Sequence, residues 1–255
     1  MFSLTTVLVR LLAKVFMNNT KLKRSENMGA KKVAEIEAEY QAVKSKSSSL
    51  NCSVGLIDIA SITTGTGYYY YGENYECCES YTIYYYKGTN YDTDWGAANS
   101  ARNSEIYINI DRLSSRIGEV DNAKAKLEKV KSDCNRSLIE LHKDKTSLKS
   151  AIDSIKGIQG TISSARSSFN AANESCRAAI GCTPDGSIAE ASQGFEFLNQ
   201  FISKTHDTDK LSNGLTKLIE QDNKIMTGAS QEGTRLENVI QDLLRKRQAE
   251  YGKLG

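Results

Sequence analysis

Apolar side chains recur every three or four residues along the second half of the chain. Stepping alternately by four and three from Ile106 to Phe169 visits nineteen positions, and fourteen of them are apolar. At 39% hydrophobic residues, chance would place only about seven apolar residues there, so the pattern predicts a heptad seam on one long helix. We predict that the seam packs against other helices or a partner through Ile106, Ile110, Leu113, Ile117, Val120, Leu127, Leu138, Leu141, Leu148, Ile152 and Ile155.

A second seam runs from Leu211 to Leu243, where eight of ten positions are apolar and the exceptions are Asp222 and Glu232. The sequence Thr183-Pro184-Asp185-Gly186 between the two seams is typical of a turn. This order predicts an antiparallel helical hairpin over residues 101–255, with its turn near 181–187. A helix within 28–49, read from the apolar stripe on Ala30–Lys46, adds a third member of the bundle. Gly157 and Gly160 weaken the long helix and predict a bend or a break there.

Residues 50–100 differ in kind from the helical segments. Two runs rich in tyrosine, Tyr68–Tyr71 and Tyr81–Tyr86, are bounded by glycine and asparagine, which is typical of strands. We predict a small β-hairpin insertion whose two faces both carry tyrosine. Its possible contact surface consists of Tyr68, Tyr69, Tyr70, Tyr71, Tyr84, Tyr85, Tyr86 and Trp95, because tyrosine offers a large, rigid, amphipathic contact area. The alternative is a sheet that only rests on the bundle.

The N-terminal segment 1–27 is amphipathic: along residues 1–17 a narrow face with Arg10 and Lys14 interrupts an otherwise apolar helix. Three interpretations remain open, namely a helix buried on the bundle, a helix on a membrane surface and a targeting peptide. Met28 is a second possible start of the chain.

The overall charge is nearly balanced, with 33 Lys+Arg against 31 Asp+Glu, and indicates no attraction to nucleic acid. The six cysteines form no CxxC pair, so no metal site is expected. Cys176 and Cys182 flank the predicted turn and could form a disulfide, or all the thiols could be free. His142 and His206 have no nucleophile or acid at a catalytic spacing. We therefore expect no enzyme, no cofactor and no metal.

The helical part, about 104–248, resembles the WXG100 superfamily of type VII secretion and its longer LXG relatives, whose helical hairpins pair lengthwise. The sequence Leu236-Glu237-Asn238-Val239-Ile240 resembles the closing helix of their partner proteins. This chain departs from the family because Trp95-Gly96 precedes the long helix and does not lie in the hairpin turn. The resemblance implies a partner-binding role and export.

Together these features predict a mainly α protein, an elongated antiparallel helical bundle with a small tyrosine-rich β-hairpin. We expect a non-enzymatic interaction or structural protein, whose partner is another helical protein or a second copy of the chain. Alternatives are a membrane-peripheral protein using residues 1–17 and an adhesin-like protein using the hairpin. The compartment is not fixed by the sequence, although a secreted or cell-envelope location is slightly favoured.

Overall fold

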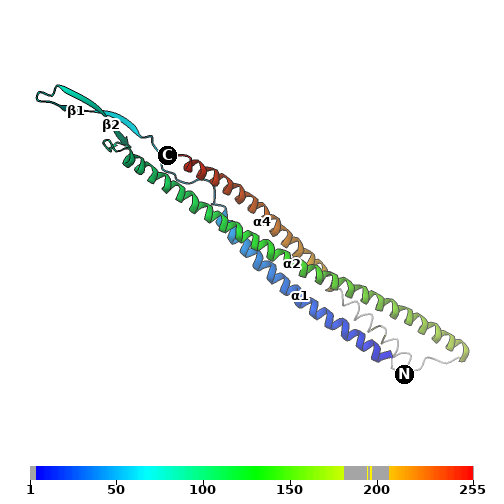
Figure 1. Ribbon diagram of the computed structural model, residues 1–255. Coiled ribbons are helices and arrows are strands. Elements are labelled where there is room, and N and C mark those ends of the chain that lie inside the picture. Colours follow the sequence, from blue (N-terminus) through cyan, green and yellow to red (C-terminus); the bar gives the residue numbers. More distant parts are fainter. Residues whose placement is uncertain (1–3, 181–193, 195, 197–206, 255) are drawn as a thin grey trace. The chain divides into compact units, whose positions relative to one another are not determined.

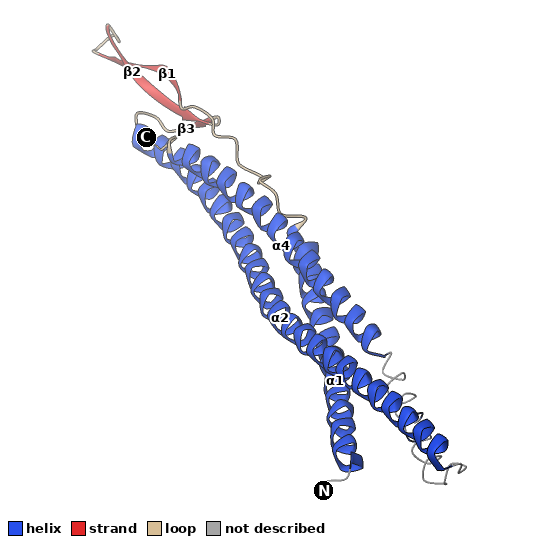
Figure 2. Ribbon diagram, turned by 90° about the vertical axis from the view of Figure 1, so that its right-hand side faces the viewer, coloured by secondary structure: helices blue, strands red, loops and turns tan. Residues whose placement is uncertain are grey.

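The computed structural model describes residues 4–180, 194, 196 and 207–254, and the side chains of residues 4–23, 25, 176, 179, 180, 207 and 208 are not described. The protein is mainly α, as the heptad pattern predicts (Figures 1 and 2). Among the described residues, the long helices are α1 (Leu4–Ser47), α2 (Trp95–Ile180) and α4 (Asp207–Tyr251), and the strands are β1 (Thr63–Tyr71), β2 (Cys77–Tyr86) and β3 (Thr89–Asn90).

The ends of the helices have local causes in the sequence. The Asp94 carboxylate accepts a hydrogen bond from the backbone N–H of Ala97 at 2.8 Å, which caps the start of α2. Lys44 and Lys46 lie in the last turn of α1, where the helix dipole favours cations. The predicted break at Gly157 and Gly160 is not found, since α2 continues through both residues.

The chain forms two compact units. The first contains residues 1–39 and 130–227, and the second contains residues 40–129 and 228–255. In both units α2 runs antiparallel to α1 and α4. In the first unit Lys32 Nζ donates to Glu140 at 2.7 Å, and Gln221 donates to Glu37. In the second unit Arg102 on α2 donates to the carbonyl of Lys253 at 2.8 Å.

The predicted seams form the core of each unit. In the first unit the buried apolar side chains of the three helices are Val33, Ile36, Val130, Cys134, Leu138, Leu141, Leu148, Ile155, Ile162, Leu211, Leu215, Ile219 and Ile225. In the second unit they include Tyr40, Val43, Ile106, Ile110, Leu113, Ile117, Val120, Leu127, Ala229, Leu236, Ile240 and Leu243. This spacing of three and four residues confirms the helical seams.

The sheet of the second unit has the order β1-β2-β3 and is antiparallel throughout. Thr63 pairs with Tyr85 and Tyr71 with Cys77, so the β1–β2 hairpin is nine pairs long. β2 turns into β3 through Lys87 and Gly88, which both have positive φ, as a two-residue type I′ turn requires. Figure 2 shows β1 and β2 extending beyond the adjacent ends of α2 and α4.

Candidate interaction surface

The β1–β2 hairpin exposes an unusual number of aromatic side chains. The exposed fractions of Tyr68, Tyr69, Tyr70 and Tyr71 run from 41% to 63%, and Tyr75 in the connecting turn is 74% exposed. Tyr81 on β2 is 39% exposed. A large apolar surface gathered on one element is typical of an interaction site, whereas single exposed apolar residues are ordinary.

The strand register divides these tyrosines between two faces, as the sequence predicts. Residues paired directly across an antiparallel sheet point to the same side. The first face carries Tyr69, Tyr71, Glu79, Tyr81 and Tyr85, and the second carries Tyr68, Tyr70, Cys78, Ser80 and Tyr84. The two faces therefore differ in charge, because only the first one includes an acidic side chain.

Two glycines of β1 make room for rings that lie against the strand. A Cβ added at Gly67 would overlap the ring of Tyr81, its directly paired neighbour. A Cβ at Gly65 would come within 3.0 Å of the ring of Tyr85. The absence of side chains at these positions lets both rings of β2 cover the backbone of β1.

The first face has internal order. The rings of Tyr69 and Tyr71 are stacked, with centroids 6.1 Å apart and planes 26° apart. The hydroxyl of Tyr71 donates a hydrogen bond of 3.2 Å to Glu79, which lies directly across from Tyr69. Two rings and one carboxylate are thus held together on an exposed surface.

The charge of this region contrasts with that of the whole chain. Residues 47–86 contain four acidic residues, Asp58, Glu73, Glu76 and Glu79, and no lysine or arginine. With 33 basic and 31 acidic residues in all, the other residues hold 33 basic and 27 acidic, a net charge of +6. The hairpin is therefore an anionic element on a chain whose remainder is cationic.

The base of the hairpin is fixed to the start of α2 through Glu105. Tyr86 donates to Glu105 Oε2 at 2.6 Å, and Lys87 Nζ donates to the same oxygen at 2.6 Å. The Lys87 and Tyr86 hydrogen bonds hold the pKa of Glu105 below its usual range. Burial, followed by the bond to Glu105, raises the pKa of Tyr86 to about 12. Tyr86 is 4% exposed, so it anchors the hairpin and does not belong to the contact surface.

The segment that leads from α1 to β1 is also held at several points. Asn109, fully buried on α2, accepts from the N–H of Ile57 at 2.7 Å and donates to its carbonyl at 2.9 Å. Arg112 donates to the carbonyl of Gly55 at 2.7 Å, and Lys246 of α4 donates to that of Cys52 at 2.6 Å. These bonds hold the segment that precedes β1 at defined points on α2 and α4.

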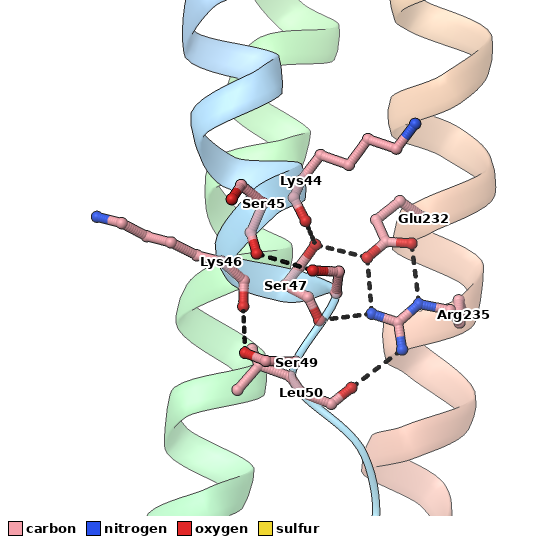
Figure 3. Close-up of polar contacts among 9 residues, drawn as sticks. Lys44, Ser45, Lys46, Ser47, Ser49, Leu50, Glu232 and Arg235 are labelled. Carbon is pink, nitrogen blue, oxygen red and sulfur yellow. Dashed lines mark hydrogen bonds and ion pairs between the residues drawn. The ribbon is translucent and has the colours of Figure 1, made fainter.

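Figure 3 shows how Arg235 of α4 closes the end of α1. Its guanidinium donates to the carbonyls of Ser47 at 2.7 Å and Leu50 at 3.0 Å, groups that a helix end leaves without internal partners. Glu232 accepts from Arg235 at 2.7 Å and from the Ser47 hydroxyl at 2.5 Å. These contacts, with Arg235 first, hold the pKa of Glu232 below its usual range.

The first unit also holds a buried carboxyl group, that of Asp222 on α4. Its side chain is 0% exposed, and neither carboxylate oxygen has a hydrogen-bond partner. Burial raises the pKa of Asp222, and the smaller opposing effects come from the Ser137 hydroxyl and the Cys134 thiol of α2 and from the charge of Lys32. Burial also raises the pKa of the Cys134 thiol, to about 12, so this thiol is unreactive at neutral pH.

The seam residues predicted to bind a partner lie inside the chain. All of those named above are buried except Ile152, which is half-buried. In this structure a partner could reach them only if the helices separated. The exposed part of the predicted contact surface is Tyr68–Tyr71 and Trp95, whereas Tyr84 and Tyr85 are half-buried.

The cysteines and the N-terminal segment are described only in part. Cys52, Cys77, Cys78 and Cys134 are free thiols. The predicted Cys176–Cys182 disulfide lies outside the described residues, as do the side chains of residues 1–17. In the described part of the chain, no three His, Cys, Asp or Glu side chains gather as metal ligands would.

The sequence did not indicate several residues that shape this region. Asn109 and Arg235 are single polar residues on helix flanks, and nothing in their spacing distinguishes them from solvated ones. Gly65 and Gly67 could have been recognised, since glycine inside a strand often marks a close approach of another group. The absence of Lys and Arg from residues 47–86 is also visible in the sequence.

Comparisons with protein-family models, with characterised proteins and with solved structures gave no match. None of the helices, over the residues described, has the length and apolar content needed to span a membrane.

Proposed function

We propose that this protein is a non-enzymatic, protein-binding module in which a helical bundle presents the β1–β2 hairpin to a partner. One observation carries the proposal: six tyrosine rings, Tyr68–Tyr71, Tyr75 and Tyr81, are exposed on one hairpin. Tyrosine is enriched at protein interfaces, and it loses little entropy when its ring becomes fixed there.

The attachment of the hairpin supports the same function. Glu105 fixes the base of the sheet, and Asn109 and Arg235 fix the segment that precedes it. A surface held in place before binding loses less conformational entropy when the partner docks. The seams of the bundle serve to support this surface, since their side chains are buried within the chain.

The test compares the full chain with a variant in which Tyr68, Tyr69, Tyr70 and Tyr71 are replaced by serine. Proteins captured from native extract are identified, purified and titrated individually against both forms. We expect a partner with micromolar affinity that the serine variant binds at least about tenfold more weakly, because hot-spot aromatics contribute about 1–2 kcal/mol or more.

The matched control replaces Tyr107 and Ile139 of α2 with serine, since these are 54% and 71% exposed on a helix. The control should bind as the native chain does. Binding that survives loss of the four tyrosines, or that is lost equally in the control, contradicts the proposal. A second copy of the chain as the captured partner is one outcome that supports it.

A role alongside type VII secretion is a second proposal. The antiparallel pairing of α2 and α4 supports it, because the WXG100 and LXG proteins that the sequence resembles pair their helices in this way. Deleting the secretion machinery of the native cell should then retain the protein inside. Unchanged export rejects this role and leaves the hairpin proposal intact.

A further inference from the structure

The first face of the hairpin combines aromatic rings with an accessible negative charge. Tyr69 and Glu79 are directly paired, Tyr71 donates to Glu79 at 3.2 Å, and Tyr81 follows Glu79 by two residues on the same face. All four side chains are exposed. We call this set, Tyr69, Tyr71, Glu79 and Tyr81, the acidic tyrosine face.

This face has the two properties that attract an organic cation. An aromatic ring presents a negative face to a cation lying over it, and an adjacent carboxylate adds a direct charge interaction. Within the described residues no ion pair reaches Glu79, and the hydrogen bond that it accepts from Tyr71 comes from a neutral hydroxyl. Nor do residues 47–86 offer any lysine or arginine that could neutralise Glu79 locally.

We propose that the acidic tyrosine face binds an arginine side chain on the surface of a partner protein. This inference rests on the proposed function and identifies the chemistry of the partner. Arginine fits better than lysine, because its planar guanidinium stacks on aromatic rings and simultaneously forms two parallel hydrogen bonds to a carboxylate. The stacked Tyr69 and Tyr71 rings supply the aromatic surface, and Glu79 supplies the carboxylate.

The opposite face of the same strands is a built-in control. Tyr68 and Tyr70 are as exposed as Tyr69 and Tyr71, but they lie across from Ser80 and Cys78. That face therefore offers rings without a charge. An arginine-binding site predicts that the two faces contribute unequally to binding, whereas simple burial of tyrosine predicts that they contribute equally.

The experiment titrates the full chain with a soluble peptide of alternating arginine and serine, measured by calorimetry at low and at physiological salt. Lysine–serine and glutamate–serine peptides of equal length serve as ligand controls. We expect the arginine peptide to bind more tightly than the lysine peptide, and we expect its affinity to fall as the salt concentration rises. The glutamate peptide should not bind.

Three variants locate the site. Glu79→Gln should weaken arginine-peptide binding about fivefold, as should Tyr69→Leu with Tyr71→Leu, because exposed ion pairs and cation–π contacts are of similar strength. Tyr69→Phe with Tyr71→Phe should restore binding, since phenylalanine keeps the ring. Tyr68→Leu with Tyr70→Leu, on the opposite face, should weaken arginine-peptide binding less than the Tyr69→Leu and Tyr71→Leu pair does. Amide exchange across β1 and β2 verifies that each variant keeps the hairpin.

Equal losses from the two leucine pairs, or unchanged binding in Glu79→Gln, overturn the inference. The charge control replaces three exposed acids of the helices, Glu35, Glu119 and Asp242, with their amides, and a loss there as large as in Glu79→Gln also overturns it. A partner that needs the four tyrosines but tolerates Glu79→Gln rejects this inference alone. Absence of any hairpin-dependent partner rejects the proposed function itself.

Discussion

The two units differ in how the polar groups between their helices are paired. In the second unit, Asn109 makes three hydrogen bonds and Glu232 receives bonds from Arg235 and Ser47. In the first unit, the fully buried Asp222 has no hydrogen-bond partner. The hydrogen bonds from Arg235 and Ser47 lower the pKa of Glu232, whereas burial raises the pKa of Asp222. The two units therefore differ in whether the polar groups between their helices are paired, and an unpaired buried group is costly.

The paired polar groups of the second unit hold the segment that precedes the hairpin. The bonds of Asn109 and Arg235 end on the segment that enters the hairpin, so they help to position the surface that we propose for binding. Asp222 is a residue of α4, and Cys134 and Ser137 of α2 act on its pKa. The next four predictions test the contrast in order of expected effect.

The largest effect is expected from Asn109→Leu. The substitution keeps the branched shape of the side chain but leaves both backbone groups of Ile57 without their partner, and among the residues described the buried Glu250 carboxylate keeps only its bond from Lys253. We expect the free energy of unfolding to fall by about 3 kcal/mol and amide exchange to accelerate over residues 50–62. Denaturant titration and exchange mass spectrometry measure both.

Asn122→Leu is the control for this change, because Asn122 is exposed on the same helix. It should alter stability by less than about 0.5 kcal/mol. Similar losses in the two variants would mean that the Asn109 bonds contribute nothing specific.

Arg235→Ala should cost about 2 kcal/mol at neutral pH, because it removes bonds to Ser47 and Leu50 and leaves Glu232 without its cation. Since the pKa of Glu232 is lowered in the folded state, the stability it contributes is present at neutral pH and is lost as the pH falls through that lowered value. The difference in the free energy of unfolding between the native chain and the variant should therefore become smaller in acid.

Arg245→Ala supplies the matched control for Arg235, since its side chain is 80% exposed and its ion pair within the described chain is with Asp242. An exposed pair of this kind contributes about 0.5 kcal/mol or less. If the stability lost in Arg235→Ala did not change with pH, the pairing with Glu232 would not be its cause.

Asp222→Asn should stabilise the protein by about 1 kcal/mol at neutral pH, because it removes a carboxyl group whose ionised form is disfavoured by burial. The raised pKa of Asp222 means that the folded state binds its proton more tightly than the unfolded chain does. The resulting stability is complete in acid and is lost as the pH rises through the folded-state pKa, so the gain from asparagine should shrink as the pH falls.

The exposed Asp242→Asn should show neither effect. A gain from Asp222→Asn that stays constant with pH would contradict a raised pKa for this carboxyl.

The smallest effect concerns the Cys134 thiol, which faces Asp222. Cys77 and Cys78 are exposed and should react quickly with a thiol reagent, whereas buried Cys134 should react only when the first unit opens. In Asp222→Asn this opening should be about fivefold rarer, in keeping with a gain of about 1 kcal/mol. Mass spectrometry of the labelled peptides separates the sites, and a faster Cys134 reaction in the variant would reverse the interpretation.

The periodicity of the sequence predicts the bundle because each helix repeats its apolar positions many times. Even the exceptions were visible: Asp222 and Glu232 interrupt the second seam, and both are polar groups placed between helices. The sequence could not show which hydrogen-bonding or charged group each of these two carboxyl groups meets, because that depends on the register between the helices. Arg235 lies three residues after Glu232 on the same helix and neutralises it, but Asp222 has no cation at an equivalent position.

The hairpin was predictable as two strands with tyrosine on both faces. The acidic tyrosine face was not, because the pairing of Tyr69 with Glu79 follows from the length of the turn at residues 72–76. The burial of Tyr86 depends on contact with Glu105 of α2. The residue pattern of β2 alone does not indicate this contact.

The register between α2 and α4 also limits how this protein can change during evolution. Asn109 meets Glu250 and Lys124 meets Glu237, two pairings on one continuous pair of helices. One residue inserted between Asn109 and Lys124 would rotate everything beyond it by about 100°, so one pairing or the other would be lost. Insertion of about seven residues in both helices nearly restores the phase. Related chains should therefore differ in helix length by whole heptads, gained or lost together in both helices.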